Sequence, residues 1–356
     1  MTDRVLTVNA GSSSLKLRLI GPDDELVAGE DLPAERGRAA LAHLTAALGR
    51  LGPADAVGHR IVHGGTRFTA PVRLDADTVA ALRSLTPLAP LHQPAALAAV
   101  EVVREALPDL PAVACLDTAF HASLPAAAAT YALPREWRER WGLRRFGFHG
   151  LSHAYASRKA NAKRTVVCHL GAGASLCAVL EGRSIDTTMG FTPLEGLVMA
   201  TRSGSVDPGL VLWLIDRERM SERSLAEALE HESGLLGLAG TADMREVLAR
   251  AATADEDAAL ALDVYVHRLR AGIASMAAAL GGLDTLVFTG GVGENAPEVR
   301  QRAAEGLPFL GVELDEQRNR DARGDAEIGS QGAPVRTLVI AAREDLEIAR
   351  QVRALV

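Results

Sequence analysis

Residues 4–20, RVLTVNAGSSSLKLRLI, contain two apolar strand patterns on either side of a turn of small residues. Residues 164–182, RTVVCHLGAGASLCAVLEG, have the same organisation. An ungapped offset of 161 residues aligns Val5 with Val166 and superposes the two small-residue turns. Short strand patterns joined by a tight turn are typical of β-hairpins. Two such hairpins, each at the start of a comparable half of the chain, predict a duplicated domain.

The remainder of the chain alternates strand patterns with amphipathic helix patterns. Further strands are predicted at 54–62, 111–116, 284–289 and 335–340. Helices are predicted at 75–85, 94–106, 208–218, 222–232, 243–252 and 256–281, from residue 296, and near 344–354. Within 21–53 only a partial strand and one helix are expected. Strands that alternate with helices predict an α/β fold.

The composition is that of an ordinary globular protein, and 356 residues are enough for two domains. The formal charge of −7 does not provide the positive field that non-specific nucleic-acid binding needs. No segment approaches about 18 consecutive apolar residues, and the first residues have no apolar signal region, so no membrane association is expected. The three cysteines lie in apolar runs without a CxxC pattern, which favours buried thiols and a cytoplasmic location.

Three turns rich in small residues are candidate phosphate-binding sites, because such turns offer backbone N–H groups at close approach. The first, at 9–16, lacks the glycine that precedes the lysine of a P-loop, which excludes a P-loop; it is either a plain hairpin turn or a phosphate site. The second, at 169–175, contains GxG, but Leu176 stands in place of the third glycine of the dinucleotide fingerprint. The third, GGVGEN at 290–295, is predicted as a turn before a helix, with Asn295 as the helix N-cap. A glycine-rich turn beside a helix N-terminus suits a nucleotide.

Three charged residues lie in otherwise apolar or small-residue sequence. Arg60 lies in the strand pattern VGHRIVHGG, and Arg202 lies in MATRSGS. A buried guanidinium needs a partner, so each arginine is either one half of a structural salt bridge or a clamp for a carboxylate or phosphoryl group. Asp117 follows the strand pattern VACL, at the end where ligand sites of α/β proteins form. It is either a helix N-cap or a magnesium ligand or base.

Two other patterns have ordinary structural explanations. His149 and His153 have the i, i+4 spacing of zinc ligands, but no HExxH motif accompanies them, so a zinc site is not expected. Asp243 and Glu246 have the spacing of a capping box at the start of a helix. A ligand contact at Asp243 is therefore only a second interpretation.

Ten motifs occur along nearly the whole chain in the order found in the acetate kinase family: VNAGSSSLK, GHRIVHGG, PLAPLHQP, CLDTAFH, RRFGFHGLSH, HLGAGAS, DTTMGFTPLEGLVMATRSGSVDPG, TADMR, FTGGVGEN and EDLEIA. The sequence thus resembles this family, which belongs to the actin-like ATPases. The resemblance implies an α/β fold of two actin-like (ribonuclease H-like) duplicated domains with an interdomain cleft. It places the first domain at 1–118 and 345–356, and the second, with the nucleotide-binding platform, at 119–344.

The resemblance also implies roles for individual residues. The catalytic residues are expected to be Asp117, Arg60, Arg202 and His149, of which His149 and Arg202 stabilise the transition state. Arg60 also binds the acetate carboxylate. The metal-side residues are Asn9 and Glu344, together with Asp117, and Ser12 and Ser14 face the phosphates. The apolar pocket for the acetate methyl group is formed by Val62, Leu91, Phe148 and Pro193. The nucleotide-binding residues are Lys16, His169, Leu170, Gly171, Ala172, Gly173, Asp243, Met244, Arg245, Gly291, Val292, Gly293 and Asn295.

The activity implied by the resemblance is reversible, magnesium-dependent transfer of the γ-phosphoryl group of ATP to acetate, which gives acetyl phosphate and ADP by direct in-line transfer. Manganese is expected to substitute for magnesium, and a homodimer is expected from the family. One alternative is a propionate or other short-chain acyl kinase with the same mechanism. Another is a non-catalytic nucleotide-binding regulator on the same scaffold.

The sequence departs from the family pattern at three places. Ala172 stands where the family usually has asparagine, which removes one side-chain contact to phosphate but leaves the backbone N–H groups. Ala341, Ala342 and Arg343 replace the usual Pro-Thr-Asn or Pro-Thr-Asp before Glu344. The segment 21–53 is also shorter than in the family. Because every charged catalytic position is retained, these departures favour an active subgroup.

Overall fold

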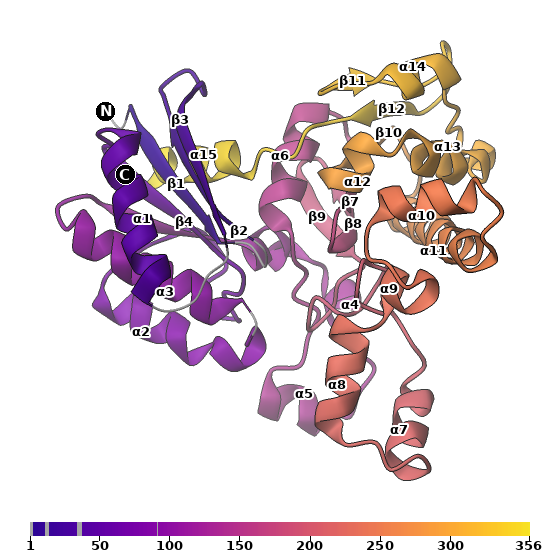
Figure 1. Ribbon diagram of the computed structural model, residues 1–356, viewed down its shortest axis with the longest axis horizontal. Helices are drawn as coiled ribbons and strands as arrows, with labels where there is room; N and C mark the ends of the chain where they lie inside the picture. The colour runs from indigo at the N-terminus through magenta and orange to yellow at the C-terminus, as the bar shows by residue number, and fades with distance from the viewer. Residues whose placement is uncertain (1–2, 11–13, 34–37, 91) are drawn as a thin grey trace. The chain divides into compact units, whose positions relative to one another are not determined.

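The computed structural model describes residues 3–10, 14–33, 38–90 and 92–356. The chain forms two compact units (Figure 1). The first comprises Met1–Ala122, Phe148–Tyr155 and Arg343–Val356, and the second comprises Ser123–Gly147 and Ala156–Ala342. The domain boundaries predicted from the sequence differ from these units at 119–122, 148–155 and 343–344, and remain a prediction.

The first unit is built on a six-stranded mixed sheet. Its strands are β1 (Val5–Ala10), β2 (Ser14–Ile20), β3 (Leu26–Pro33), β4 (Ala56–Ile61), β5 (Val72–Arg73) and β6 (Ala112–Leu116). In the order β3-β2-β1-β4-β6-β5, the first three strands are antiparallel, and β4 and β6 run parallel to β1. The helices are α1 (Arg38–Leu51), α2 (Ala76–Ser84), α3 (Gln93–Ala106), α15 (Glu344–Leu355), the first residues of α6 (Gly150–Ala160), and 3₁₀ turns at Thr86–Leu88 and Asp117–Ser123.

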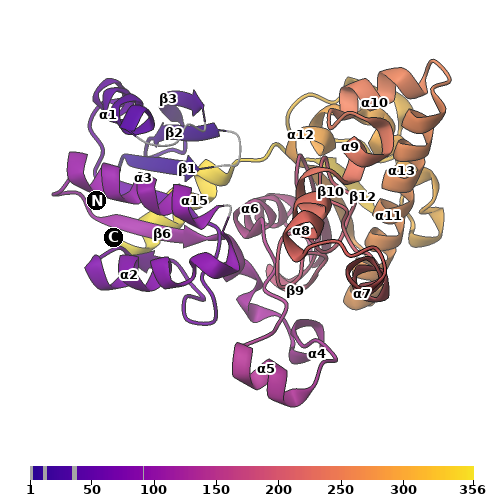
Figure 2. The same cartoon turned by 60° about the horizontal axis from the view of Figure 1, so that its bottom comes forward.

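Helices cover both faces of this sheet, as Figure 2 shows for α3 and α15. Successive residues of β1 point to opposite faces, so Leu6 joins the core under α1 and α3, whereas Val5 joins the core under α15. Gly58 of β4 lies directly under α15. A Cβ atom at Gly58 would overlap the side chains of Ile348 and Val352, so glycine is what allows this helix to lie against the strand.

The second unit contains another six-stranded mixed sheet. Its strands are β7 (Arg164–Leu170), β8 (Ala174–Leu180), β9 (Arg183–Thr187), β10 (Thr285–Thr289), β11 (Ala326–Glu327) and β12 (Arg336–Val339). Its helices are α4 (Ala126–Ala129), α5 (Arg135–Trp141), α7 (Pro208–Asp216), α8 (Glu222–His231), α9 (Gly234–Ala239), α10 (Met244–Ala251), α11 (Glu256–Leu280), α12 (Gly290–Asn295), α13 (Pro297–Glu305), α14 (Glu316–Asp321) and a 3₁₀ turn at Pro308–Leu310. The long helix α11 packs against β7, β8 and β9.

The two sheets have the same topology, which confirms the duplication. The order β9-β8-β7-β10-β12-β11 repeats β3-β2-β1-β4-β6-β5, including the antiparallel edge strand beside the last parallel strand. The ungapped offset of 161 is wrong across the hairpin, however. It would place Glu181 opposite Val166, because Val5 pairs with Ile20, but the residue opposite Val166 is Ala178. Between these paired positions the second hairpin is three residues shorter, so one ungapped offset cannot align both of its strands with those of the first hairpin.

Most predicted elements are present within a few residues of their expected ends, but GGVGEN is not a turn. Residues 290–295 form α12, and the N-cap of α13 is Ala296 rather than Asn295. The Asn295 side chain instead donates to the carbonyl oxygen of Gly291 at 2.9 Å. The sequence also did not predict β9 or α6. Within 21–53, where only a partial strand was expected, residues 26–33 form the full strand β3.

Asp243 is the N-cap of α10, as predicted, and accepts from the backbone N–H of Arg245. The return bond of the predicted capping box is absent from this helix start. Glu246 accepts a hydrogen bond from the hydroxyl of Thr241 at 2.7 Å instead. Asp243 therefore caps this helix start without a reciprocal bond from Glu246. A separate contact joins Thr241 to Glu246.

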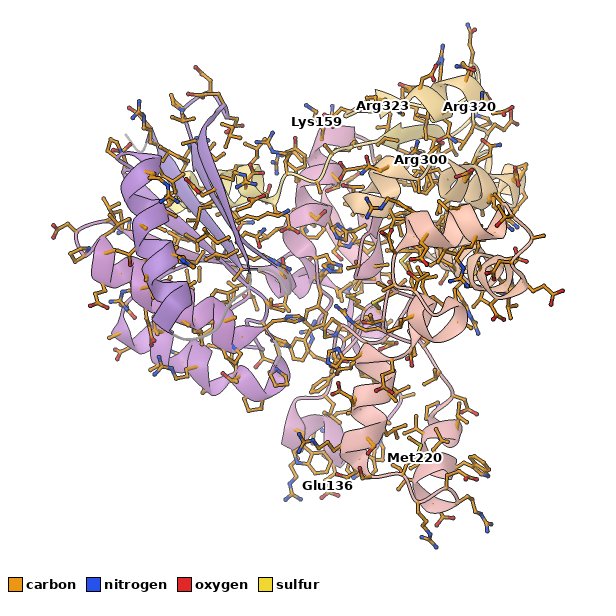
Figure 3. The ribbon with its side chains drawn as sticks, in the orientation of Figure 1. Glu136, Lys159, Met220, Arg300, Arg320 and Arg323 are labelled. Carbon is orange, nitrogen blue, oxygen red and sulfur yellow. The ribbon has the colours of Figure 1, made fainter. Side chains whose placement is uncertain are left out.

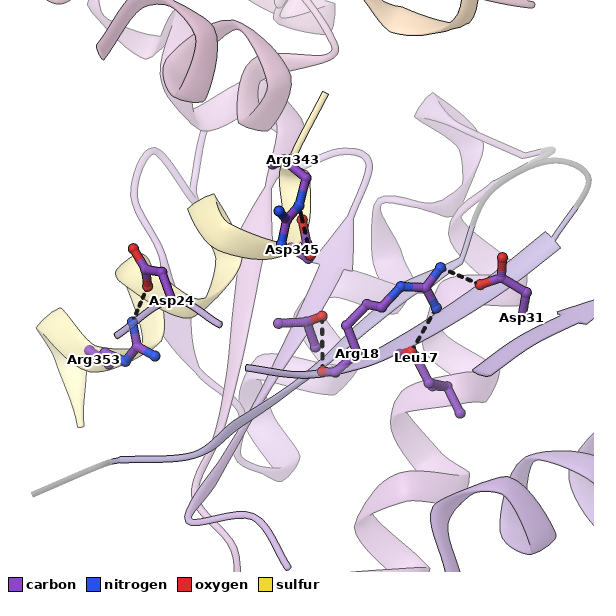
Figure 4. A network of polar contacts seen from close by, with 8 residues as sticks. Leu17, Arg18, Asp24, Asp31, Arg343, Asp345 and Arg353 are labelled. Atoms are coloured by element: carbon purple, nitrogen blue, oxygen red, sulfur yellow. Dashed lines mark hydrogen bonds and ion pairs between the residues drawn. The ribbon is translucent and has the colours of Figure 1, made fainter. Parts of the chain in front are cut away.

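Ion pairs surround α15 in the first unit (Figure 4). Arg353, near the end of α15, pairs with Asp24 in the turn between β2 and β3 at 2.6 Å. Arg343 pairs with Asp345 at the start of the helix at 2.9 Å. Partly exposed pairs of this kind contribute little stability individually, on the order of 0–1 kcal/mol. The apolar contacts under α15 therefore hold this helix more firmly than its charges do.

The described residues contain no helix that is both long enough and apolar enough to cross a membrane. Cys115, Cys168 and Cys177 are all buried and free, as predicted from their apolar surroundings.

Candidate active site

Four predicted site residues meet at one edge of the first sheet. Arg60 lies on β4 and Asp117 directly follows β6, and these two parallel strands are neighbours. Parallel strands end at the same edge of a sheet, which brings the two side chains together. The guanidinium Nε and Nη2 atoms of Arg60 donate to Asp117 Oδ2 at 3.0 and 2.6 Å. Nη1 of Arg60 donates to Asn9 Oδ1 at 3.2 Å, and Asn9 Nδ2 donates to Glu344 Oε2 at 2.7 Å.

This cluster places two carboxylates around one guanidinium. Asp117 is buried, with its side chain 1% exposed, and the side chain of Arg60 is 14% exposed. Glu344 lies 3.9 Å from Arg60 Nε. Burial raises the pKa of Asp117, while the Arg60 guanidinium acts to lower it and Glu344 to raise it. Burial lowers the pKa of Arg60, but Asp117 and Glu344 outweigh this effect and raise it overall. The salt bridge predicted as one alternative for Arg60 is therefore present.

Asp117 does not act as a helix N-cap. It is the first residue of the 3₁₀ turn Asp117–Ser123, and one oxygen of its side chain is taken by Arg60. The other oxygen, Oδ1, is buried and has no hydrogen-bond partner among the described residues. A buried carboxylate oxygen without a donor is suited to a cation or to a water bound to one.

These oxygens fit a magnesium ion of the type that binds nucleotides. Mg²⁺ usually keeps several waters and takes one or two carboxylates together with substrate phosphates. Asp117 Oδ1 and the Glu344 carboxylate supply this number of protein ligands. The described residues contain no group of three or more His, Cys, Asp or Glu side chains arranged to hold a metal.

A close backbone approach fixes His149 beside Asp117. His149 has a φ of 57°, a left-handed conformation that is uncommon for a residue with a side chain. The next residue, Gly150, begins α6 and lies against the Asp117 carbonyl so closely that a Cβ atom would overlap it. Strained backbone of this kind is often retained at functional sites. The strain and the close contact hold His149 at the same sheet edge as Asp117.

Among the described residues, two of the four predicted acyl-pocket residues lie in the first unit. Val62 follows β4 and is buried, and Phe148 is buried directly before His149. The Phe148 carbonyl oxygen is 2.9 Å from His121 Nε2, and its ring packs edge-on against His63. These contacts place Phe148 next to His63, which follows β4. Leu91 and Ser12 lie outside the described residues.

In the second unit, two predicted glycine-rich segments lie side by side. β7 and β10 are parallel neighbours, and His169 at the end of β7 pairs with Thr289 at the end of β10. Gly290 has a φ of 79° and approaches Leu170 so closely that a Cβ atom would contact the Leu170 backbone. Gly173 accepts from the backbone N–H of Gly171 at 2.9 Å, which closes the β7–β8 turn. The turn and α12 together form a surface of backbone groups with few side chains.

Apart from Lys16, the remaining nucleotide-binding candidates lie at the ends of α10 and α12 and at the β7–β8 turn. The side chain of Arg245 binds both oxygens of Asp243, and this contact lowers the pKa of Asp243. Arg245 is itself largely exposed, and Met244 is buried beneath it. Ala172 accepts from the backbone N–H of Ala200 at 3.1 Å. The exposed Lys16 lies on β2 of the first unit, opposite Asn9.

Arg202, in contrast to Arg60, has no ion pair among the described residues. Its Nη1 donates to the carbonyl oxygen of Pro193 at 2.8 Å and lies 3.6 Å from the Met199 sulfur. Burial lowers the pKa of Arg202, and the charge of Glu230 acts to raise it. The structural salt bridge considered for Arg202 is therefore not formed there. Its partners are neutral, which leaves the positive charge available to an anionic ligand.

One buried arginine behind α12 has no counterpart in the sequence predictions. Arg300, marked in Figure 3, is 1% exposed. Its Nη1 donates to the carbonyl oxygens of Gly293 and Glu294 at 2.8 and 2.9 Å, and its Nε donates to Asn319 at 2.8 Å. Burial lowers its pKa to about 10, with a smaller contribution from Arg323. The sequence does not predict these contacts of Arg300, because most of its partners are backbone carbonyls, which have no sequence pattern.

Comparison with known proteins supports the same fold. Residues 38–350 match the family model described as the acetokinase family. An acetate kinase from Nostoc punctiforme is 49% identical over 315 residues, which cover 86% of this chain and 78% of that protein.

Two solved structures resemble the chain over nearly its whole length. A propionate kinase from Francisella tularensis has a TM-score of 0.91 at 36% identity, with coverage of 99% of this chain and 100% of that one. An acetate kinase from Porphyromonas gingivalis has a TM-score of 0.91 at 33% identity, with 99% of each chain covered. The predicted α/β fold of two duplicated actin-like domains is thereby confirmed. The chain belongs to the acetokinase family.

Proposed function

We propose that this protein transfers the γ-phosphoryl group of ATP to the carboxylate of acetate, giving acetyl phosphate and ADP by direct in-line transfer. The observation that carries the proposal is the cluster of Arg60, Asp117, Asn9 and Glu344 at one sheet edge. Both reactants are anions, so the reaction needs positive charge fixed before the reactants meet. Family membership supports the same activity, because relatives named acetate kinase share up to 49% of aligned residues.

The first unit is assigned to the acceptor and the metal. Arg60 orients the acetate carboxylate, and His149 donates a hydrogen bond to the transferring phosphoryl group. Asp117 and Glu344, with Asn9, hold the magnesium ion or its waters; manganese is expected to serve in its place. When bound, the ion neutralises charge on the phosphates. Asp117 also keeps Arg60 in a fixed orientation through two hydrogen bonds.

The second unit is assigned to the nucleotide. Backbone N–H groups of the β7–β8 turn face the phosphates, and α12 with the Asp243–Arg245 pair holds the adenosine. Arg202 stabilises the charge of the phosphoryl group in the transition state, since no carboxylate of the described residues neutralises it. Little covalent chemistry is required of the protein, so positioning and charge supply the rate enhancement.

A hydroxamate assay for acyl phosphate tests the proposal. With MgATP we expect turnover with acetate, and loss of turnover when EDTA removes the metal and recovery when Mg²⁺ or Mn²⁺ is added back. Absence of turnover with every acid of two to four carbons would contradict the kinase assignment and favour the non-catalytic regulator. A protein fully active in excess EDTA would contradict the roles given to Asp117 and Glu344.

A propionate kinase is the second candidate, because a solved propionate kinase matches the chain at a TM-score of 0.91. One additional methylene in an apolar pocket contributes only about 1–3 kcal/mol of discrimination. We therefore expect acetate and propionate both to react, with kcat/KM values that differ by at most about 200-fold. The same assay run with both acids decides which is preferred.

Shortening Val62 should shift this preference. Val62→Ala opens space for one further methylene, so KM for propionate is expected to fall relative to KM for acetate, while kcat changes little because binding alone is altered. Steady-state kinetics with both acids measures this ratio. An unchanged ratio, or an equal fall in kcat for both acids, would show that Val62 does not line the acyl pocket.

A cytoplasmic homodimer is proposed on the basis of the family resemblance. Light scattering at the concentration used in the assay tests the dimer, and a monomeric mass would contradict it.

A further inference from the structure

A network of three side chains in the second unit lies outside the residues assigned above. We name Tyr131, Arg145 and Glu195 the loop anchor. The Tyr131 hydroxyl donates to Glu195 Oε2 at 2.6 Å, and Arg145 Nη2 donates to Glu195 Oε1 at 2.7 Å. Arg145 also lies over the Tyr131 ring, at 5.6 Å from its centroid. Both oxygens of Glu195 are thus occupied by donors from one short segment.

The loop anchor holds the backbone of residues 188–191. Arg145 Nη1 donates to the carbonyl oxygens of Thr188 and Met189 at 3.1 and 3.0 Å. The backbone N–H of Phe191 donates to the Tyr131 hydroxyl at 2.9 Å. Burial and Glu195 raise the pKa of Tyr131, so its hydroxyl keeps the proton that it donates. The hydroxyl of this tyrosine therefore contacts both Glu195 and the backbone of Phe191.

Pro193 lies between the two ends that the loop anchor fixes. Its carbonyl oxygen accepts from Arg202 Nη1 at 2.8 Å, the shortest contact of that guanidinium. Arg202 has no ion pair among the described residues, so its hydrogen bond to the Pro193 carbonyl oxygen positions the charged guanidinium. The orientation of the Arg202 guanidinium therefore depends on the conformation of the loop that contains Pro193.

Gly190 shows how closely the loop anchor is packed. A Cβ atom at this position would overlap Glu195 Oε2 and the Tyr131 hydroxyl. The Gly190 carbonyl oxygen also accepts from the backbone N–H groups of Phe146 and Gly147 at 3.0 and 3.3 Å. Gly147 directly precedes Phe148 in the sequence. The same packing thus fixes the start of the segment that continues into Phe148 and His149.

From these contacts we infer that Glu195 is a positioning residue for the phosphoryl transfer. It acts through Pro193 on Arg202 and does not itself touch the reactants. The inference rests on the proposed function. It predicts that disturbing Glu195 alters the acceptor and transfer steps but not the affinity for the nucleotide, whose binding surface is formed by the β7–β8 turn, α10 and α12.

The test measures kcat and the KM values for acetate and ATP in three variants. Glu195→Gln keeps an acceptor for Tyr131 but loses the charge that pairs with Arg145, and Gly190→Ala pushes the loop anchor apart without removing a charge. For both we expect kcat/KM for acetate to fall by about 100-fold, because a displacement near 1 Å of a positioning group has that effect. KM for ATP is expected to stay within about twofold of wild type. Tyr131→Phe removes one hydroxyl only and should give a smaller loss.

Asp284→Asn is the matched control, because the Arg164–Asp284 pair has similar geometry and exposure in the same unit and no assigned role. Its kcat/KM values should remain within about twofold of wild type, as for an ordinary surface substitution. Glu195→Gln and Gly190→Ala proteins with wild-type kcat/KM would overturn the inference. Equal losses in Asp284→Asn, or a rise in KM for ATP as large as the fall in kcat/KM for acetate, would also overturn it. A wild-type protein that forms no acyl phosphate would overturn the proposed function, and the inference with it.

Discussion

Arg202→Ala is expected to lower kcat by about 10²- to 10³-fold, the usual effect of removing one preorganised donor to a transition state. The melting temperature should remain within about 2 °C of wild type, because the side chain has no ion pair among the described residues and its loss leaves no buried countercharge. Steady-state kinetics and thermal melting of the same preparation provide both numbers.

Arg202→Lys serves as the charge-conserving comparison. A lysine restores the charge but not the planar guanidinium, which can contact Pro193 and an anion at the same time, so rescue should be poor. Full rescue by lysine, or a fall in stability that accounts for the loss of rate, would contradict a role for Arg202 in the transition state.

Asp117→Asn is expected to reduce both stability and rate. The substitution leaves Arg60 with Asn9 and with a carboxylate 3.9 Å away as its remaining partners. Breaking a buried ion pair by removing one partner destabilises a protein by about 3–5 kcal/mol. Because the Glu344 carboxylate remains near Arg60, we expect a loss near the lower of these values. Urea unfolding measures this change, and kcat is expected to fall at least about 100-fold because Arg60 loses its fixed orientation.

A double variant separates the structural and the catalytic contribution. Replacing Arg60 by Met together with Asp117 by Leu removes both charges and should restore much of the stability, because apolar residues can replace a buried pair with little change in the free energy of unfolding. Activity should remain absent. A double variant that recovers acetate turnover would show that Arg60 and Asp117 serve only the fold.

The duplication and the location of the site were predictable, because both depend on local patterns that are repeated. Two hairpins with small-residue turns predicted two related sheets, and the sheets have the same strand order. Asp117 was predicted to lie at the carboxyl end of a strand, and Arg60 on the neighbouring parallel strand contacts it there. Because β4 and β6 are parallel neighbours, residues at their carboxyl ends lie close together. This proximity can be predicted without knowing any side-chain contact.

The details that were not predictable depend on contacts between distant segments. GGVGEN forms α12 rather than a turn, although glycine disfavours helices, because Glu294 accepts from the backbone N–H of Gly290 and of Ala342. The second of these contacts joins residues 48 positions apart. Glu195 likewise contacts Tyr131, 64 positions away, and Arg300 contacts Asn319, 19 positions away. No local pattern specifies such partners.

The claim that acetate accepts the phosphoryl group is tested most directly by ³¹P NMR of the purified protein with MgATP and acetate. The account predicts a new acetyl phosphate resonance that increases in step with ADP, and no increase without acetate. Formation of ADP with inorganic phosphate alone would identify a simple ATPase. A spectrum that stays unchanged would identify a nucleotide-binding protein without transfer activity, and either result would contradict the account.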